Sequence, residues 1–303
     1  MCSNNNLKFD SKAANLDSKN NTSDNNECSN SNATCNYSEC SGSNVNCIPS
    51  ECSGSNVNCI PSECSYSNCS SSDSNIDDTI KRDYNRSINM WNDVYSKCKI
   101  VDLKGKSLSV EPMFDICLDI FASECKKVLD FGCGTGDVIF QCYEFGNMDS
   151  GLGIDLSETG IEFAKKFASV NKYNNLDFKV GDISYFDNFA DGSFDGIILS
   201  NVLDVMPKDV ALKTFKRLTG LLAPKGLMFV KLNPFYEKSD MKEWGLTQIK
   251  DNLFEENGVL RYRELDTASW KQSFEKHYEI IRYLEFPYPW QEGMNRLFLL
   301  QKK

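Results

Sequence analysis

Short apolar runs alternate with amphipathic stretches along most of the chain after residue 122. Short apolar runs bounded by turn-forming residues predict buried strands, and apolar residues spaced three or four apart predict the helices between them. Strands that alternate with helices in this way predict an α/β fold with a parallel sheet. The runs that we assign to strands are 128–131, 153–157, 178–183, 195–201 and 227–232.

Two more helices are predicted ahead of the first strand, in residues 76–122. The first carries its large apolar residues along a single face, as an amphipathic helix does. The second runs from about Pro112 to Phe121, with proline at its start, where a missing N–H costs nothing. The apolar face of the first helix consists of Ile80, Tyr84, Ile88, Trp91, Val94 and Tyr95.

The segment 233–277, after the fifth strand, is longer than a plain crossover helix needs. Asn257 and Gly258 lie between apolar flanks and predict a hairpin turn. Asp266 or Thr267 is expected to cap the helix that follows. The aromatic residues of this segment either line a cap over a ligand or form the segment's own core. The last apolar runs predict two closing strands, at 278–284 and 296–301.

The first 75 residues differ in composition from the rest of the chain. They contain three lysines, no arginine and eight acidic residues, a local charge of −5 within the net −10 of the chain. Large apolar residues are few here, so burial cannot offset the entropy cost of ordering the backbone. We therefore expect 1–75 to be a disordered, low-complexity tail rich in Cys, Asn and Ser, and 76–303 to fold.

A 12-residue unit repeats within this tail. Residues 40–51 and 52–63 are identical, CSGSNVNCIPSE, and 28–39 is a diverged copy. With Cys2 and a truncated copy from Cys64, the tail holds nine of the 14 cysteines. Four interpretations stay open: an extension without chemistry, thiolate metal binding, a disulfide framework, or a peptide substrate presented in cis. The cysteine spacing differs from the two-residue clip of zinc sites, and disulfides would need an oxidising compartment.

Charge and hydropathy exclude several kinds of partner. The chain has 43 acidic and 33 basic residues without a basic patch, so it lacks what non-specific nucleic-acid binding requires. No run approaches the roughly 18 apolar residues of a membrane helix, and the N-terminus does not resemble a signal peptide. We expect a cytoplasmic protein that binds neither nucleic acid nor membrane; its oligomeric state is left open.

The strongest candidate for a binding site is the segment 128–137, VLDFGCGTGD. Asp130 lies at the end of the predicted strand, and Gly132, Gly134 and Gly136 then supply a turn that a Cβ would obstruct. Helical spacing resumes directly afterwards, so the glycines lie at a strand-to-helix junction, where free N–H groups and the helix dipole are concentrated. A ligand is therefore expected to approach bare backbone.

The spacing of the glycines distinguishes between ligands. The dinucleotide fingerprint, Gly-x-Gly-x-x-Gly, would need a glycine where this chain has Asp137, which disfavours a nicotinamide-dependent dehydrogenase. The segment instead resembles, residue for residue, motif I of the class I S-adenosylmethionine-dependent methyltransferases. Asp155 and Asp182 lie at the ends of the second and third predicted strands, where this family places acids for the cofactor's ribose hydroxyls and adenine amino group. The resemblance covers about residues 80–303.

This resemblance implies a Rossmann-like class I methyltransferase fold, with a seven-stranded, mostly parallel sheet closed by an antiparallel strand. It divides the folded part into a cofactor-binding core (123–232), a substrate-side insertion (233–277) and closing strands (278–303), after the helices of 76–122. The implied cofactor is S-adenosyl-L-methionine. The residues expected to bind it are Asp130, Gly132, Cys133, Gly134, Gly136, Asp155, Leu156, Asp182, Ile183 and Asn201, with Trp91 and Tyr95 from the first helix.

Methyl transfer from a sulfonium is an in-line displacement that depends mainly on holding the reactants collinear at roughly 3 Å contact. A general base is optional, so the lack of an obvious catalytic residue does not argue against the activity. Asn201, Asp204, Asn233 and Tyr185 are candidates to face the methyl acceptor. Alternatively, Asn201 and Asp204 cap the helix that follows the fourth strand. The single histidine, His277, is expected at the surface.

These observations predict an enzyme, a class I S-adenosylmethionine-dependent methyltransferase that acts on an unidentified small-molecule acceptor and has no metal site. Two alternatives remain. One is methylation of a peptide or protein, including the chain's own Cys-rich tail. The other is a protein that binds the cofactor without turnover.

Overall fold

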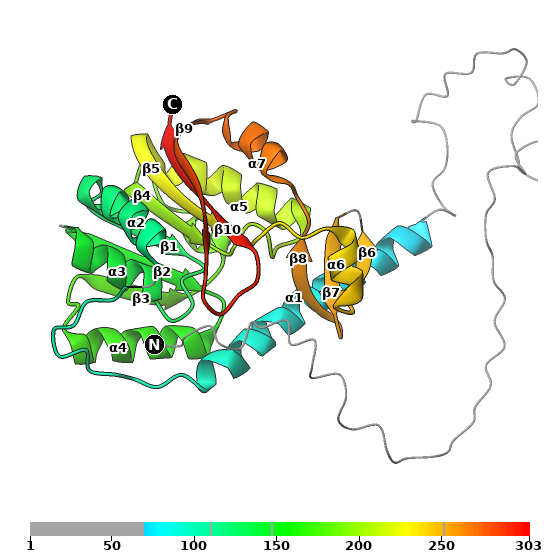
Figure 1. Ribbon diagram of the computed structural model, residues 1–303, viewed down its shortest axis with the longest axis horizontal. Coiled ribbons are helices and arrows are strands. Elements are labelled where there is room, and N and C mark those ends of the chain that lie inside the picture. Colours follow the sequence, from blue (N-terminus) through cyan, green and yellow to red (C-terminus); the bar gives the residue numbers. More distant parts are fainter. Residues whose placement is uncertain (1–69, 110, 147, 251) are drawn as a thin grey trace, which may run out of the picture. The chain divides into compact units, whose positions relative to one another are not determined.

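The computed structural model describes residues 70–109, 111–146, 148–250 and 252–303 (Figure 1). The predicted tail, with its cysteine repeats, lies outside these residues except for its last six. Those six belong to the first helix, α1 (Ser70–Ser96), which therefore begins earlier than the apolar pattern predicts. No helix in the described part of the chain is long and apolar enough to cross a membrane.

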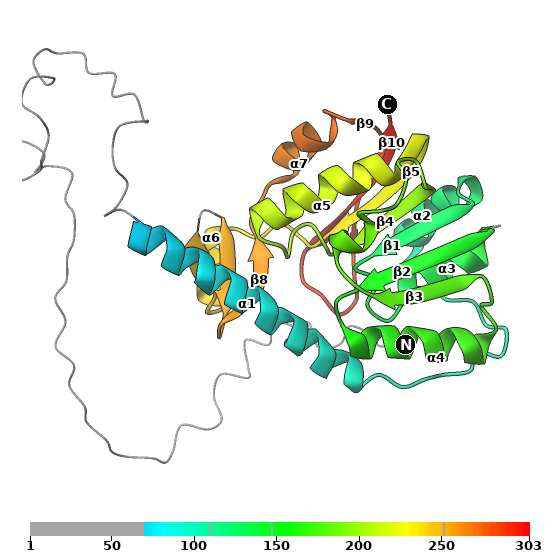
Figure 2. The same ribbon diagram turned by 180° about the vertical axis from the view of Figure 1, so that it is seen from behind.

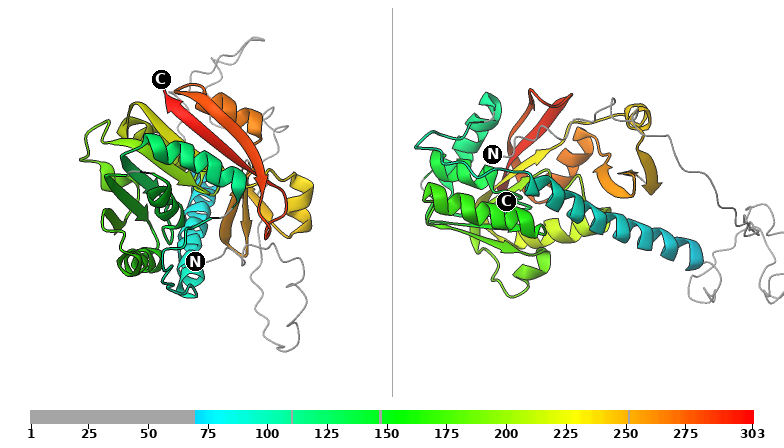
Figure 3. Two further views of the ribbon diagram at one scale, coloured as in Figure 1. Left: turned by 60° about the vertical axis from the view of Figure 1, so that its left-hand side comes forward. Right: turned by 90° about the horizontal axis from the view of Figure 1, so that it is seen from below.

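A seven-stranded sheet lies at the centre of the fold, in the order β3-β2-β1-β4-β5-β10-β9. The first five strands pair in parallel, and β10 pairs antiparallel with both β5 and β9 (Figure 3). The predicted α/β fold, mostly parallel with an antiparallel closing strand, is confirmed. The strands are β1 (Lys127–Phe131), β2 (Ser150–Asp155), β3 (Leu176–Val180), β4 (Phe194–Ser200), β5 (Leu222–Leu232), β9 (Tyr278–Pro287) and β10 (Met294–Lys302).

Helices cover both faces of the sheet, which explains why its strands are apolar without alternation. Successive residues of β1 face opposite sides: Val128 packs among residues of α2, α3 and α4, and Leu129 packs among residues of α5 and α7. Figures 1 and 2 show these two faces. The helices are α2 (Pro112–Glu124), α3 (Asp137–Phe145), α4 (Glu158–Asn171), α5 (Lys208–Leu221) and α7 (Thr267–Phe274).

Strand β5 is longer than the sequence predicts. The segment 224–226, which precedes the predicted strand 227–232, belongs to the strand, because pairing with β4 begins at Leu222 directly after α5 ends. The ladder shifts register between Phe194 and Gly196, and this irregularity accommodates the proline and glycine.

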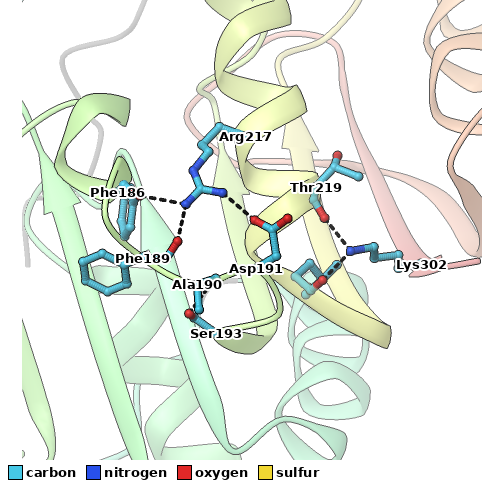
Figure 4. Close-up of polar contacts among 9 residues, drawn as sticks. Phe186, Phe189, Ala190, Asp191, Ser193, Arg217, Thr219 and Lys302 are labelled. Carbon is cyan, nitrogen blue, oxygen red and sulfur yellow. Dashed lines mark hydrogen bonds and ion pairs between the residues drawn. The ribbon is translucent and has the colours of Figure 1, made fainter.

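Arg217 of α5 fixes the loop that leads from the short 3-10 helix η1 (Ile183–Phe186) into β4 (Figure 4). Its guanidinium donates to the carbonyls of Phe186 (2.7 Å) and Phe189 (2.6 Å) and pairs with Asp191 at 2.7 Å. Charge-assisted bonds of this kind are among the stronger ones in proteins. The loop following the third strand is therefore tied to the helix layer.

The insertion forms a small three-stranded antiparallel sheet with its own core. Its elements are α6 (Lys238–Glu243), β6 (Thr247–Lys250), β7 (Leu253–Glu256) and β8 (Val259–Arg263). Phe254 and Tyr262 are buried in this core, so these two aromatic residues pack within the insertion. The predicted turn at Asn257 and Gly258 joins β7 to β8 with positive φ at both residues, and Asp266 caps α7 as expected.

Helix α1 lies beside this insertion. The hydroxyl of Ser87 donates to the carbonyl of Leu260 at 3.1 Å, and both residues lie in the contact between α1 and β8. A Cβ added at Gly258 would come within 2.2 Å of Arg86, which shows how closely the hairpin turn approaches the helix. Segments more than 170 residues apart in the sequence thus meet along one side of the fold.

Candidate active site

A cavity of about 270 Å³ opens where the parallel strands end. Its lining comes from the segments after β1, β2, β3 and β4, from one face of α1, and from Leu260 of β8. Carboxyl ends of parallel strands meet at one edge of a sheet, which is where ligands bind in open α/β folds. No cluster of potential metal ligands occurs among the described residues.

The glycine turn after β1 forms the floor of this cavity. Gly132, Gly134 and Gly136 have φ values of 75°, 52° and 85°, a region that residues with a Cβ rarely adopt. A Cβ on Gly134 would lie 2.5 Å from the hydroxyl oxygen of Tyr95, and one on Gly132 would lie 2.5 Å from a methyl of Val202. The turn therefore requires glycine both for its backbone and for the space above it.

Replacing Gly134 by alanine is expected to weaken ligand binding at the turn more than it lowers stability. Positive φ costs a non-glycine residue about 1–2 kcal/mol, and the new methyl would also displace Tyr95. Gly245→Ala is the matched control, because Gly245 has a φ of 82° with no atom near its Cβ position. Gly134→Ala should lower the unfolding temperature at least as much as the control does, and only Gly134→Ala should lose cofactor affinity in calorimetric titration. If both variants bind the cofactor with equal affinity, the ligand does not lie against the glycine turn.

Asp155, at the end of β2, holds the glycine turn in place. One carboxylate oxygen accepts the N–H of Gly134 and the other accepts the N–H of Ser157, both at 2.8 Å. Burial raises the pKa of this carboxyl, and the same backbone N–H groups oppose the rise. Each oxygen keeps a second lone pair, so the carboxylate can receive two further donors from a ligand in the cavity.

Asp130 is the most unusual group of the site. Its side chain is almost fully buried, and neither carboxylate oxygen has a hydrogen-bond partner within the described residues, although the N–H of Ile139 lies near enough to favour the charged form. Burial, with Asp155 adding to it, raises the pKa of Asp130 to about 8. A buried carboxyl without a partner is costly unless a donor or cation reaches it. It is therefore suited to a positively charged ligand group.

Asp130→Asn is expected to flatten the pH dependence of stability. Because the pKa of Asp130 is higher in the folded state than in the unfolded state, the folded protein keeps the carboxyl proton to a higher pH. The stability that this group contributes is therefore fully present below about pH 4 and is lost as the pH rises towards 8. The slope contributed by this group is at most about 1.4 kcal/mol per pH unit. Urea unfolding of the cofactor-free protein at several pH values measures it. An unchanged slope in the variant would show that Asp130 is ionised in the folded state.

One face of α1 covers the cavity. Tyr84, Ile88, Trp91 and Tyr95 line it, and the rings of Trp91 and Tyr95 stack with their centroids 5.5 Å apart. Burial and the nearby carboxylates of Asp155 and Asp182 raise the pKa of Tyr84 to about 12, so its hydroxyl stays protonated at neutral pH. The sequence placed all four on one helix face but could assign only Trp91 and Tyr95 to a ligand.

A protein-family model described as a methyltransferase domain matches residues 122–280, which is more than half of the chain. The chain belongs to this methyltransferase family. The family resemblance that the glycine motif predicted is thus confirmed.

Individual relatives match the methyltransferase domain over part of its length. An uncharacterized protein of Rickettsia prowazekii is 36% identical over 36% of this chain and 44% of its own length. A human tRNA N(3)-cytidine methyltransferase is 29% identical over 42% of this chain and 35% of its own. The chain therefore spans less than half the length of these curated relatives.

A crystal structure of Burkholderia thailandensis 1,6-didemethyltoxoflavin-N1-methyltransferase, with its substrate and S-adenosylhomocysteine bound, superposes with a TM-score of 0.53. It is 16% identical, and the match covers 76% of this chain and 90% of that one. At this identity the likeness shows a shared fold.

Most of the residues predicted to bind the cofactor in the methyltransferase domain line this cavity. Gly136 is the exception, because it starts α3 behind the turn and does not line the cavity. The carboxylate of Asp182 accepts the N–H and the hydroxyl of Ser184, and these bonds lower its pKa. The predicted residues that line the cavity are Trp91, Tyr95, Asp130, Gly132, Cys133, Gly134, Asp155, Leu156, Asp182, Ile183 and Asn201.

Two predicted catalytic residues of the methyltransferase domain, Asp204 and Asn233, do not line the cavity. Asp204 is fully buried, and one of its oxygens accepts the backbone N–H (2.7 Å) and the side-chain amide (3.1 Å) of Asn233. The two residues thus bind each other between the end of β4 and the end of β5. Both residues were predicted to face the methyl acceptor, because the sequence does not show which residues of these segments face the cavity.

Asn201 lines the cavity, unlike Asp204, and has a left-handed backbone with a φ of 56°. Neither residue caps α5, whose N-cap is Pro207, so the capping alternative is wrong. Tyr185 is more than a third exposed and packs against Phe186 and Phe189 outside the cavity lining. His277 is exposed, as expected.

Lys231 is not among the residues predicted for the site. This lysine is only 1% exposed, and its ammonium donates to the side-chain oxygen of Asn201 at 2.7 Å. Burial lowers its pKa to about 7, while the charge of Asp204 favours the protonated form. Its position inside the apolar run 227–232 could have indicated a special role, because a charged residue in a buried strand is rarely fully buried without a partner.

Proposed function

We propose that this protein is an S-adenosyl-L-methionine-dependent methyltransferase acting on a small-molecule acceptor. The observation that carries the proposal is the pairing of a buried, unpartnered Asp130 with a glycine turn that leaves no room for a Cβ. A ligand for this site must bring a cationic group to Asp130 and lie against bare backbone. An adenosyl sulfonium with an α-ammonium group meets both requirements.

The residues present fit the cofactor in chemical terms. Asp155 has lone pairs for the two ribose hydroxyls, and Asp182, which lines the same cavity, would accept from the adenine amino group. The backbone N–H groups at the start of α3, which has no side-chain cap, suit the carboxylate of the methionine part. Trp91 and Tyr95 would cover the bound molecule from α1.

When bound, the cofactor supplies an electrophilic methyl group on its sulfonium. The protein's contribution is to hold the acceptor in line with that methyl group and to keep water out, which is a proximity effect. No histidine lines the cavity, and its tyrosines have raised pKa values, so an acceptor atom with its own lone pair fits best. Asn201 is the polar side chain that we assign to the acceptor side.

The relatives leave the acceptor class open, since one of them is named for a tRNA. Two observations favour a small molecule for this chain. The cavity is covered by α1 and Leu260, and the whole chain carries a net charge of −10. Duplex or structured RNA would need a cationic surface leading to the site. The insertion 233–277 would then form the acceptor side of the domain, and the cytoplasm remains the expected location.

Calorimetric titration with S-adenosylmethionine, followed by an assay for release of S-adenosylhomocysteine with a panel of acceptors, tests the proposal. Binding with turnover on small molecules is expected. Absence of binding at about 1 mM would overturn it, and binding without turnover on any acceptor would favour a cofactor-binding protein instead. Intact-mass analysis after incubation with the cofactor tests self-methylation, because that alternative requires a mass gain in the tail 1–75.

A further inference from the structure

The cavity is chemically asymmetric. Four aspartates line it, and no lysine, arginine or histidine does among the described residues. The acids come from the end of β1, the start of α3, the end of β2 and the segment after β3, where the cofactor would lie. They are Asp130, Asp137, Asp155 and Asp182. The remaining wall therefore decides what kind of acceptor can enter.

That wall is mainly apolar and is built from three distant segments. α1 supplies Ile88 and Trp91, the segment after β4 continues into α5, and β8 supplies Leu260. The bond between Ser87 and the Leu260 carbonyl fixes the spacing between α1 and the insertion at this wall. The residues contributed by the segment after β4 and by α5 are Val205, Met206 and Val210.

Asn201 adds a directional polar contact to this wall. The side-chain nitrogen of Lys231 donates to the amide oxygen of Asn201 at 2.7 Å, so this oxygen faces Lys231. Lys231 does not line the cavity, and its ammonium packs 5.0 Å from the ring centroid of Tyr288. The Asn201 backbone is also held, because its N–H donates to the Lys231 carbonyl at 2.8 Å. The amide nitrogen is thus the atom left to face the cavity.

We propose that the acceptor is an uncharged, largely apolar small molecule, one of whose heteroatoms accepts a hydrogen bond from the Asn201 amide, with Lys231 as the residue that orients this amide. This inference rests on the proposed function and narrows its substrate class. A carboxylate or phosphate in the same place would lie near several acids without a cation to pair with, which disfavours anionic acceptors and RNA.

Binding to the full-length protein saturated with S-adenosylhomocysteine tests the charge requirement. The probes are 2-naphthol, 2-naphthoate and unfractionated tRNA, with affinities measured by equilibrium dialysis. We expect 2-naphthol to bind at least about tenfold more tightly than 2-naphthoate. The proposal is overturned if 2-naphthoate or tRNA binds as tightly as 2-naphthol, or if 2-naphthol does not bind at about 1 mM. Failure of S-adenosylhomocysteine itself to bind would instead overturn the proposed function.

Two variants test the polar contact. Asn201→Asp keeps the shape but replaces the donor by an acceptor. The affinity for 2-methoxynaphthalene, whose ether oxygen only accepts hydrogen bonds, should therefore fall about tenfold, while the affinity for naphthalene, which has no heteroatom, should change less. Lys231→Met leaves the amide free to rotate and should lower the preference for 2-methoxynaphthalene over naphthalene. Asn89→Asp, on the exposed side of α1, is the matched control.

Cofactor affinity and thermal unfolding separate these effects from misfolding. Lys231→Met should still bind S-adenosylhomocysteine, because Lys231 does not line the cavity. The affinity of Asn201→Asp for S-adenosylhomocysteine is measured first, and if this variant does not bind it, the ratio of the two probes in Lys231→Met decides. If the variants that bind S-adenosylhomocysteine bind 2-methoxynaphthalene and naphthalene in the wild-type ratio, Asn201 does not contact the acceptor and the polar part of the proposal is wrong.

Discussion

Asp155→Ala is expected to remove about 2–4 kcal/mol of cofactor affinity, the cost of two hydrogen bonds to a charged group. The structure places the effect at the upper end of this range. Both oxygens of Asp155 already hold backbone N–H groups, those of Gly134 and Ser157, so the variant also loses the constraint on the glycine turn. The dissociation constant for the cofactor should therefore rise about a thousandfold.

Titration calorimetry with S-adenosylhomocysteine measures the loss for Asp155→Ala. The matched control is Asp177→Ala on β3, because the side chain of Asp177 is 61% exposed and forms a surface ion pair with Lys179. The control should bind as wild type does, since surface ion pairs contribute little. If Asp155→Ala also binds as tightly as wild type, the cofactor lies elsewhere.

Asp204→Ala is expected to lower the free energy of unfolding by about 3–5 kcal/mol, as removal of one partner from a buried charge cluster does. The carboxylate accepts two hydrogen bonds from Asn233, and its charge favours the protonated forms of Lys231 and Arg263. Arg263 in turn donates to the Leu203 carbonyl at 2.7 Å and lies over the ring of Trp270. The alanine variant would leave buried cations uncompensated.

Urea unfolding compares Asp204→Ala with Asp209→Ala, an exposed acid in the first turn of α5. The control should change stability by less than about 1 kcal/mol, the usual size of a helix-dipole contribution. The comparison also decides the role that the sequence suggested for Asp204. A stable variant that binds the cofactor but has lost turnover would make Asp204 catalytic, whereas a destabilised variant with normal cofactor affinity would make it structural.

The sequence was sufficient for the fold and for the glycine turn and the acids that line the cavity. Both depend on local patterns: apolar runs define the strands, and an acid followed by alternating glycines defines the turn after β1. Because parallel strands bring their carboxyl ends to one edge, Asp130, Asp155 and Asp182 had to converge once the strands were placed. Even the cap at Asp266 and the turn at Gly258 follow from local backbone preferences.

The acceptor side depended on contacts between distant segments. Asn201 and Asp204 are three residues apart, yet one lines the cavity and the other is buried against Asn233. That difference arises from the left-handed backbone at Asn201 and from pairing with β5, neither of which leaves a periodic signal in the sequence.

The sequence by itself determined the order of strands and helices, the glycine turn and the acids that follow each strand, because these are set by residues close together in the chain. Only the tertiary structure decided that Lys231 orients Asn201 and that α1 and Leu260 close the cavity. The physical reason is that a buried side chain's partners are chosen by packing between elements, and packing joins residues that the sequence holds far apart.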